Sequence, residues 1–341
     1  MAAIAQIQNP TLLDLARRLD PDGSISTIVE LMTPVSEVLE DMTWIEGNLV
    51  TGNRTTVRTG LPAPTWRKMY GGVQPNKSTT TMITDNCGML EAYAEVDKAL
   101  ADLNGNTAAF RLSEDMAWIA GLNQTMAQTI FYGNEGTQPE AFTGLAPRFN
   151  SLSAPNAENI IDGNGTAGTN NSIWLVYWSP NTVCGIVPKG STAGIQRRDM
   201  GEVTIEDVTG AAGGATGGGR MQAYRTHYRW DGGLTVRDWR SVVRICNIDL
   251  ATLVKTGATG ADLPDLMFQA LEVVPSIVAA GARAAFYTSR TVLTYLRRQM
   301  ANKTSGSTLA IEDVGGKKVM TFQGVPLRRV DALAANEARV V

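Results

Sequence analysis

Histidine, cysteine and lysine are the side chains whose type and spacing could support chemistry in this chain. Its single histidine, His227, lies in the segment YRTHYRW, and catalysis of the Ser-His-Asp or Cys-His kind would depend on it. No G-x-S-x-G nucleophile elbow accompanies this histidine, because GSTAG at residues 190–194 has a different spacing. We therefore expect His227 to have a structural or interface role.

The cysteines Cys87, Cys184 and Cys246 are odd in number, and none lies in a C-x-x-C pair. This pattern favours separate buried thiols in a cytosolic protein over a disulfide framework or a zinc site. A single histidine with scattered cysteines also lacks the ligand set of a transition-metal site. We expect no metal and no other cofactor.

Two further segments begin like ligand-binding loops and then depart from the pattern. GGATGGGR at residues 213–220 lacks the G-K-[ST] end of a phosphate-binding loop, so a mobile loop is expected there. Asp20-Pro21-Asp22-Gly23 starts like a calcium loop but has no further ligand spacing and no closing glutamate. Nothing marks any two carboxylates as a catalytic pair, and the sequence predicts a protein that is not an enzyme.

The composition is that of a folded chain with little free surface charge. The chain has 341 residues, of which 43% are hydrophobic and 18% charged, which allows one large or two ordinary domains. Low charge suits a subunit whose surface is covered by neighbours, although an ordinary soluble monomer is also compatible. The net charge of −3 argues against a basic face for duplex DNA. The N-terminus lacks the features of a signal peptide, and no apolar run approaches the roughly 18 residues of a membrane span.

The element that dominates the pattern is a long helix expected over residues 106–132. Apolar residues recur there every three or four positions and therefore share one face. They are Leu112, Met116, Ile119, Leu122, Met126 and Ile130. Arg111 and Asp115 are four residues apart and are expected to pair on the solvent side. Asn106 is expected to cap the start, and Gly133 to end the helix in a left-handed conformation.

Residues 46–85 form the second informative segment. Strands are expected at 50–58 and 63–69, joined at 59–62, with a returning strand at 79–84. Arginines make this hairpin polar on both faces, and a two-stranded polar hairpin is at best marginally stable alone. The sequence leaves open whether the hairpin lies on a partner surface or is a flexible surface loop.

The remaining elements are short and mixed, which predicts an α+β fold. Helices are expected at 10–19, 25–32, 33–42, 91–103, 263–280 and 289–300, the last capped by Ser289. Strands are expected as a hairpin over 172–188 split at 179–181, at 203–208, around 231–233 within 226–249, at 284–287, and as a hairpin over 319–330 with Gly324 at its turn.

The long helix and the loop after it resemble the spine helix and following loop of tailed-phage major capsid proteins with the HK97 fold. The loop carries G-x-x-G-T-x-P-x-x-F-x-G-L, formed by Gly133, Gly136, Thr137, Pro139, Phe142, Gly144 and Leu145. Further along, SIWLVYWSPNTVCGIVPKGSTAG, WDGGLTVRDWRSVVRICNID, AAFYTSRTVLTYLRRQM and FQGVPLRRVDAL follow one another. This order resembles the major capsid proteins of short-tailed phages such as epsilon15 and the Bordetella phages.

The resemblance implies an HK97-like α+β fold with distinct segments along the chain. These would be an N-terminal arm at 1–45, an extended loop at 46–85, a peripheral domain at 86–150 with the spine helix, a mainly axial domain at 151–315, and a return to the peripheral domain at 316–341. The extended loop would lie across the adjacent subunit and contact it through Arg54, Arg58, Trp66, Arg67, Lys68 and Tyr70. The structural spine would be formed by Leu112, Met116, Ile119, Met126 and Ile130.

The implied function is that of a major capsid protein, which forms pentamers and hexamers that build an icosahedral head around double-stranded DNA. The DNA would be enclosed without sequence-specific binding, and no membrane would be involved. Partners would be a scaffolding protein, a portal and a cement or decoration protein. The scaffolding protein would be a separate chain, because only about forty residues precede the extended loop. Assembly would take place in the host cytoplasm and the product would be the virion, without N-terminal cleavage.

Three alternatives are also compatible with the sequence. Some HK97-fold shells crosslink a loop lysine to a neighbouring asparagine, and Lys68 and Lys77 lie in the extended-loop region, but we expect ordinary solvated lysines. An encapsulin-type compartment enclosing a cargo enzyme would share the fold. A soluble hydrolase or nucleotide-binding enzyme is the remaining alternative from another class.

Overall fold

The computed structural model describes residues 36–103, 107–166, 168–208, 219–254, 260–275, 281–302, 309–314 and 317–341. The described chain forms two compact units. The first contains Met89–Met126 and Gly194–Trp230, and the second contains Val35–Gly88, Ala127–Ala193 and Asp231–Val341. The expectations for residues 1–35, for Asn106 as a cap and for the glycine-rich segment 209–218 lie outside the described residues.

In the first unit, a long antiparallel ladder joins β7 (Gln196–Val208) to β8 (Gly219–Val236). The ladder confirms the strand expected at 203–208 and extends it toward the N-terminus. Its register shifts between Asp199 and Gly201, and Gly201 has a φ of 68°. A residue in this left-handed region is typical of a β-bulge, which increases the local twist of a ribbon.

Strand β3 (Thr79–Asp97) corrects the helix expected at 91–103, of which only α3 (Lys98–Asp102) is helical. The segment 91–97 alternates polar and apolar residues, and Ala94 and Val96 are buried while Glu91 and Tyr93 are exposed. This period of two is the strand pattern. Apolar residues in the same segment also recur at about every four positions, which fits a helix. The sequence of so short a segment could therefore not distinguish a strand from a helix.

The first unit has small cores built on α3, β3 and the first part of α4 (Thr107–Tyr132). Val96, Leu100 and Phe110 form one cluster, and Ala94, Leu122 and Tyr228 form another. Burial of apolar surface stabilises a fold by roughly 25 cal/mol per Å². Because small clusters bury less apolar surface than a single large core, they contribute less to stability.

The second unit is built on three strands that are buried along most of their length: β5 (Asn170–Trp178), β9 (Val242–Asp249) and β10 (Arg283–Thr288). Strand β5 pairs antiparallel with β9 and with β10. Every residue of β5 and β9 is buried, so both faces of the sheet are covered. Strands covered on both faces have continuous apolar sequences, which explains why SIWLVYW was recognisable as a strand.

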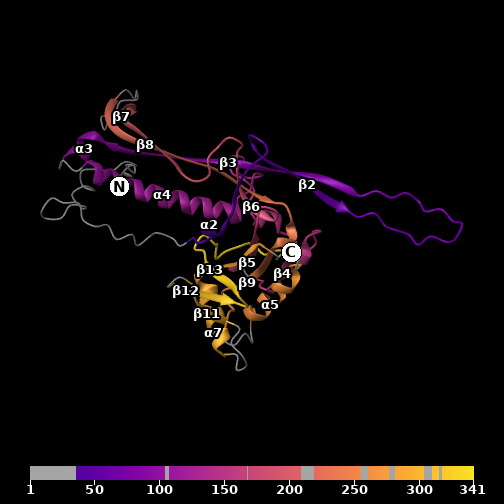
Figure 1. Cartoon of the computed structure of the whole chain (residues 1–341). Coiled ribbons are helices and arrows are strands. Elements are labelled where there is room, and N and C mark those ends of the chain that lie inside the picture. Colours follow the sequence, from indigo (N-terminus) through magenta and orange to yellow (C-terminus); the bar gives the residue numbers. More distant parts are fainter. Residues whose placement is uncertain are drawn as a thin grey trace. The chain divides into compact units, whose positions relative to one another are not determined.

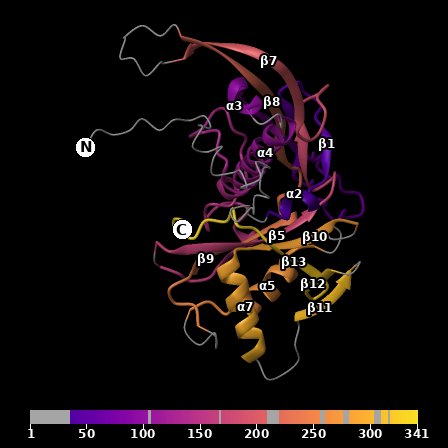
Figure 2. The same ribbon diagram turned by 90° about the vertical axis from the view of Figure 1, so that its left-hand side faces the viewer.

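Helices α5 (Leu263–Val273) and α7 (Arg290–Asn302) cover one face of this sheet. Figure 2 shows both helices on the same side of β5 and β10. Leu263, Met267, Val292 and Leu296 are buried there against β5 and β9. Ser289 caps α7 as expected, because its side chain accepts a hydrogen bond from the backbone N–H of Val292 at 3.4 Å.

The opposite face of the sheet is covered by aromatic side chains from the end of α4 and the turn after it. Phe131 packs against Trp174 and Tyr287, with ring centroids 6.2 and 6.0 Å apart. Phe149 meets Trp174 edge-to-face, with centroids 6.3 Å apart. Such geometries add to the gain from burial, and they fix the last turns of α4 on the sheet.

Shorter strands and helices complete the second unit. They are α2 (Val38–Asp41), β1 (Trp44–Glu46), β4 (Ile160–Asp162), β6 (Val183–Val187), β11 (Leu309–Val314), β12 (Lys317–Phe322), β13 (Val325–Arg329) and the 3₁₀ turns Ala146–Arg148, Ala157–Asn159 and Trp239–Ser241. Strands β12 and β13 form the expected hairpin, with Gln323 and Gly324 at φ 51° and 79° in its turn.

Two expected turns were wrong. Strands β5 and β6 exist but form no hairpin, since they touch in parallel only at Trp178 and Val183, and β6 instead pairs with β1 and β8. Strand β8 continues through Asp231-Gly232-Gly233 to Val236. Glycine is needed at position 233 because the backbone of Asn86 approaches it closely: a Cβ on Gly233 would lie 2.7 Å from the carbonyl oxygen of Asn86.

Within the described residues, no helix is long and apolar enough to cross a membrane.

Candidate subunit interface

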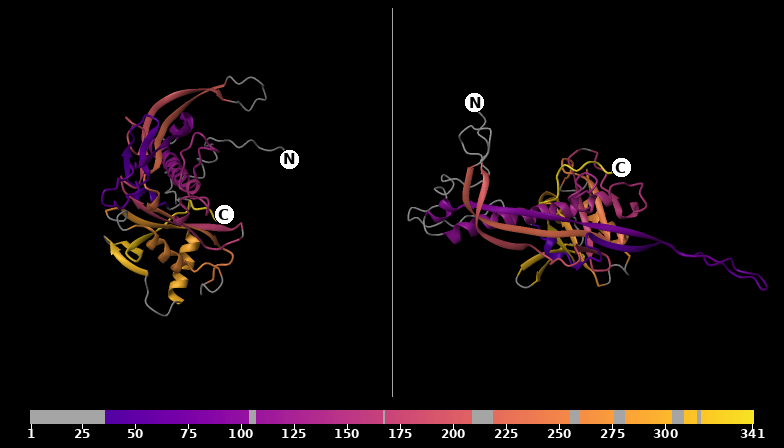
Figure 3. Two further views of the ribbon diagram at one scale, coloured as in Figure 1. Left: turned by 90° about the vertical axis from the view of Figure 1, so that its right-hand side faces the viewer. Right: turned by 90° about the horizontal axis from the view of Figure 1, so that it is seen from above.

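The hairpin of the second unit is formed by β2 (Gly52–Gly60) and the first part of β3, paired antiparallel from Gly52–Asn86 to Gly60–Thr79. Residues 61–78 contain no strand, so the strand expected at 63–69 was wrong. Pro62 and Pro64 explain this, because proline lacks the N–H that a ladder needs. We call residues 61–78 the hairpin tip. Figures 1 and 3 show the hairpin extending away from the sheet at its root.

A buried carboxylate fixes the root of the hairpin. Asp85 is 5% exposed and lies 2.8 Å from the Arg148 guanidinium, and it accepts a 2.6 Å hydrogen bond from the Thr235 hydroxyl. Arg148 also donates to the carbonyl oxygens of Thr143 and Leu234. A buried charge that is paired and hydrogen-bonded on several sides holds its neighbours in one arrangement.

Glycine is required where the two strands leave the root. A Cβ at Gly52 would lie 2.0 Å from the carbonyl oxygen of Asp85, well inside any tolerated contact. Asn48 closes the turn before β2 by exchanging two hydrogen bonds with the backbone of Arg54, each 2.7 Å long. The stem therefore leaves the body in a fixed direction.

The two faces of the hairpin stem differ chemically. Thr55 pairs with Ile83 and Val57 with Thr81, and these residues line a cleft of about 1040 Å³. The loop containing Trp239 forms the opposite wall of this cleft. Arg54 and Arg58 alternate with these residues along β2, and Arg58 also lines the cleft. The expectation of a hairpin that is polar on both faces is therefore only partly right, because Val57 and Ile83 lie beside Thr55 and Thr81 on one face.

The hairpin tip is exposed throughout, apart from Gly71. The side chains of Trp66 and Tyr70 are fully exposed, and Met69 is 90% exposed. Within the tip, Arg67 donates to the carbonyl oxygen of Gly71 at 2.8 Å, and Asn76 donates to that of Ala63 at 2.6 Å. Large apolar side chains held in solvent in this way are typical of an interaction surface.

All the residues expected in the extended-loop contact are exposed and lie along the hairpin, but they do not converge on one compact site. They are Arg54, Arg58, Trp66, Arg67, Lys68 and Tyr70. The structure therefore places them along an extended surface, as expected for a strand-like contact rather than a pocket.

Helix α4 covers residues 107–132 as expected, but its apolar face is not continuous. Met126 and Ile130 are buried and Ile119 is partly buried, whereas Leu112 is 58% and Met116 53% exposed. The Arg111–Asp115 pair was wrong: Arg111 binds Asp199 at 2.7 Å and the buried Asp115 binds Arg197 at 3.0 Å. Both partners, Asp199 and Arg197, lie on β7, which the local spacing along the helix could not reveal.

Gly133 ends α4, but its φ is not positive, so the left-handed end was wrong. A Cβ at this position would lie 2.4 Å from the carbonyl oxygen of Phe142. Glycine is therefore needed here because the loop after the helix returns and packs closely against the helix end.

The histidine and the cysteines that were considered for catalysis or metal binding make contacts that suit a structural role. His227 stacks on Tyr93 with ring centroids 4.6 Å apart, and its Nε2 lies 3.3 Å from a Glu91 carboxylate oxygen. Cys184 and Cys246 are buried and Cys87 is half-buried, and all three thiols are free. Among the described residues, no group of three or more histidine, cysteine, aspartate or glutamate side chains is arranged to hold a metal ion.

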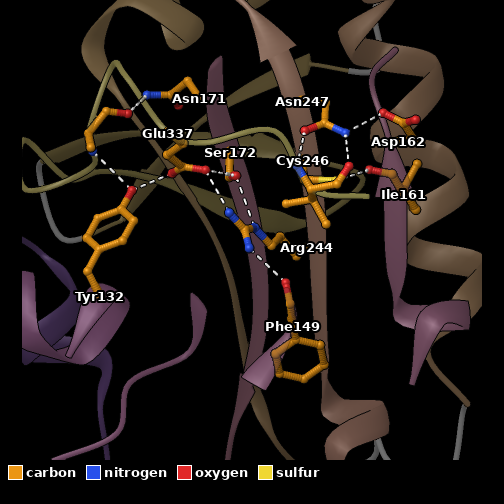
Figure 4. A network of polar contacts seen from close by, with 12 residues as sticks. Tyr132, Phe149, Ile161, Asp162, Asn171, Ser172, Arg244, Cys246, Asn247 and Glu337 are labelled. Carbon is orange, nitrogen blue, oxygen red and sulfur yellow. Dashed lines mark hydrogen bonds and ion pairs between the residues drawn. The ribbon is translucent and has the colours of Figure 1, made fainter. Parts of the chain in front are cut away.

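A buried polar network fastens the C-terminal segment to the sheet of the second unit (Figure 4). Arg244 forms an ion pair with Glu337 at 2.8 Å, and both side chains are 5% exposed. Arg244 also donates to Ser172 and to the carbonyl oxygen of Phe149, while Tyr132 and Ser172 donate to Glu337. Burial, followed by the Glu337 charge, raises the pKa of Tyr132, which keeps its hydroxyl a donor.

Asn247 adds a second attachment for the same segment. Its side chain exchanges two hydrogen bonds with the backbone of Val340, 2.9 and 2.8 Å long. It also donates to Asp162 at 2.9 Å. Neither Asp85 nor the Arg244 network was expected from the sequence. The one available signal for Asp85 is that it is the first carboxylate after Glu46.

The family model of major capsid protein GP7 matches residues 20–341. The chain belongs to this family of major capsid proteins. It is therefore a phage capsid subunit with the HK97-like fold, which confirms the family, the fold and the capsid function expected from the sequence. Its place is in the virion.

Among solved structures, a chain of bacteriophage epsilon15 is 38% identical to this capsid subunit, with a TM-score of 0.78. The match covers 100% of this subunit and 99% of the epsilon15 chain. The capsid of bacteriophage JBD30 matches at 10% identity, covering 90% and 95% of the two chains with a TM-score of 0.48.

The SrpI encapsulin of Synechococcus elongatus matches at 10% identity with a TM-score of 0.43, covering 66% of this subunit and 92% of the encapsulin. This distant match does not favour the encapsulin alternative. No curated protein sequence matches the subunit.

Proposed function

We propose that this capsid subunit forms pentamers and hexamers that close into an icosahedral head around double-stranded DNA, and that the hairpin is its main contact with the adjacent subunit. The observation that carries this proposal is the exposed tip with Trp66, Met69 and Tyr70 on a stem whose root is fixed by Asp85. A surface of this kind is stable in water only if a partner covers it.

The reach of the hairpin fits a contact between subunits. From Gly52 to Tyr70 the chain could extend by roughly 60 Å at about 3.3 Å per residue. Permanent assemblies bury areas of order 2,000 Å² or more per subunit, and a projecting arm supplies such an area without a large globular face. The contacting residues would be Arg54, Arg58, Trp66, Arg67, Lys68 and Tyr70.

One chain must fit both pentamers and hexamers, so rigid and adjustable parts are needed. The rigid part would be the sheet of β5, β9 and β10 with its covered faces, together with α4 as the spine. The adjustable parts would be the N-terminal arm at 1–45, the extended loop at 46–85 and loops of the axial segment within 151–315. Residues 86–150 and 316–341 would form the peripheral domain.

A separate scaffolding protein, a portal and a cement or decoration protein would take part in assembly, which would occur in the host cytoplasm. The DNA would be enclosed without sequence-specific contacts, in keeping with a subunit of net charge −3. The subunit would act by geometry and not by catalysis.

The test is electron microscopy of the purified subunit, with and without the co-expressed scaffolding protein. Closed shells or capsomer rings are expected from the native chain. A variant in which residues 61–78 are replaced by an Asn-Gly turn should fold, because the stem keeps its register, yet fail to form them. Shells formed equally well without the tip would show that the hairpin is not the main contact, and a monomer that never assembles would exclude the capsomer proposal.

A further inference from the structure

Charge is distributed unevenly between the hairpin and the rest of the subunit. Residues 47–84 contain Arg54, Arg58, Arg67, Lys68 and Lys77 but no aspartate or glutamate, which gives a charge of +5. Since the whole chain carries −3, the remainder carries −8. The hairpin is therefore a cationic arm on an acidic subunit, and a second copy offers it a surface of opposite sign.

The loop after α4 is the complementary feature in the same unit. Residues 133–145, which we call the acidic loop, contain Glu135 and Glu140 and no cation. Glu140 is exposed and Glu135 half-buried. No ion pair among the described residues involves either of them, whereas Asp85, Asp238 and Glu337 are paired. The acidic loop thus presents charge that the subunit itself does not neutralise.

The acidic loop is held in one conformation. Gly144 donates to the carbonyl oxygen of Gly133 at 2.8 Å, and Leu145 donates to that of Ile130 at 2.9 Å. Asn134 organises the tip of the loop, since its side chain accepts from the backbone N–H of Gly136 at 2.9 Å. Phe142 and Leu145 are buried beneath it. A surface that is already ordered loses little conformational entropy when a partner binds.

The acidic loop lies at the opposite end of the hairpin from the tip. A Cβ on Gly88, just beyond the hairpin root, would lie 2.9 Å from the carbonyl oxygen of Glu140. The hairpin tip cannot fold back to this loop, because the stem between them is a paired ladder from Gly52 to Gly60. The cationic and acidic surfaces of one copy are therefore separated, and they can meet only between copies.

We propose that the cationic hairpin tip of one subunit docks on the acidic loop of a second copy, with Arg67, Lys68 and Lys77 facing Glu135 and Glu140. This inference rests on the proposed role of the hairpin in assembly and assigns its acceptor. The contact joins two different surfaces, so it is heterologous and repeats head to tail around a ring. Every copy in a closed ring then supplies one tip and one acidic loop.

The test is a charge swap in the full chain: Lys68→Glu, Glu140→Lys and the two together. Assembly is followed by light scattering at about 50 mM salt, with circular dichroism to verify folding. Each single reversal should slow assembly by about tenfold, because steering by opposite charge raises association rates by roughly 10- to 1000-fold. The combined variant should return to within about threefold of the native rate, since each interface regains an opposite pair.

Arg297→Glu and Glu272→Lys provide matched controls, since both residues are exposed on α7 and α5 and carry the same charge changes. They should leave the rate unchanged. The native chain should assemble more slowly as salt rises toward about 500 mM, where screening shortens the range of the field to a few Å.

The possible results separate this inference from the proposed function. If the single reversals slow assembly but the combined variant gives no recovery, the acidic loop is not the acceptor and the inference is overturned. If neither reversal nor salt changes the rate while replacement of the tip still abolishes shells, the hairpin docks without these charges, which also overturns it. Assembly without the tip would overturn the role of the hairpin itself.

Discussion

Arg244 is the residue on which the buried polar network of the second unit depends. It contacts Glu337, Ser172 and the carbonyl oxygen of Phe149, and its guanidinium lies 5.0 Å from the centre of the Trp174 ring. Removing one partner of a buried ion pair leaves the other charge without compensation, which costs far more than losing an exposed pair.

We therefore expect Arg244→Met to lower the free energy of unfolding by about 3–5 kcal/mol. Urea unfolding of the unassembled subunit would measure it. Arg240→Met is the control, because the Arg240 side chain is 48% exposed in its 2.7 Å pair with Asp238. That change should cost about 1 kcal/mol or less. Equal losses in the two variants would mean that the network contributes no more than a surface pair.

The thiols of Cys87, Cys184 and Cys246 should be unreactive in the folded subunit. Burial raises the pKa of Cys87 to about 12 and that of Cys184 and Cys246 to about 11, from an ordinary value of 9.0. The thiolate is the reactive form, so iodoacetamide at pH 8 should modify none of them in the folded subunit, and all three after unfolding in urea. Mass spectrometry would count the labels.

The same pKa shifts make stability fall in alkali. Well below pH 9 the thiols are neutral in both states, and their ionisation does not affect stability. Between about pH 9 and 11 the thiols of the unfolded chain ionise, while the buried thiols of the folded subunit stay neutral. Ionisation therefore stabilises the unfolded state relative to the folded state. We expect the urea midpoint to be lower at pH 10 than at pH 8. A midpoint that rose with pH would contradict the sign of these shifts.

At the scale of elements, the hairpin shows how a single buried residue orients a long strand pair. Asp85 joins β3 to Arg148 in the 3₁₀ turn and to Thr235 in β8. Beyond the root, residues 55–61, Thr81 and Ile83 of the hairpin line one cleft. The direction of the hairpin is therefore set at its root, where the packing is dense.

We expect Asp85→Asn to lower the free energy of unfolding by about 2–4 kcal/mol, because Arg148 loses its buried counter-charge but keeps its carbonyl acceptors. Hydrogen exchange should speed up in residues near the root, from Gly52 to Arg54 and at Asn86. Asp331→Asn is the comparison, since it removes the half-exposed pair with Arg329. Unchanged exchange at the root would show that glycine packing alone fixes the hairpin.

At the scale of the whole subunit, the C-terminal segment closes the second unit. Residues 334–341 contain Glu337, which neutralises Arg244, and Val340, which is held by Asn247. Contacts between residues so far apart in sequence require a long intervening loop to close, which costs conformational entropy. The rest of the sheet therefore depends on a segment at the end of the chain.

We expect a variant lacking residues 334–341 to give little soluble subunit, because Arg244 and Asn247 lose buried partners together. Deletion of Val341 alone should be tolerated, since its side chain is exposed and its backbone accepts a hydrogen bond from the N–H of Leu152 near the surface end of the segment. Soluble yield and melting temperature would compare the two. A stable truncated subunit would show that the segment covers the sheet without supporting it.

Local signals in the sequence were enough to predict the range of α4, the cap at Ser289, the turn at Gly324 and the apolar runs of β5 and β9. The sequence also carried the resemblance that the family match confirmed. Only the tertiary structure shows that residues 91–97 form a strand and that Arg111 and Asp115 form ion pairs with residues of β7. Tertiary structure also decided that Asp85 anchors the hairpin. The reason is physical: helix caps and turns depend on a few neighbouring residues, whereas ion-pair partners and strand pairing depend on residues that only folding brings together.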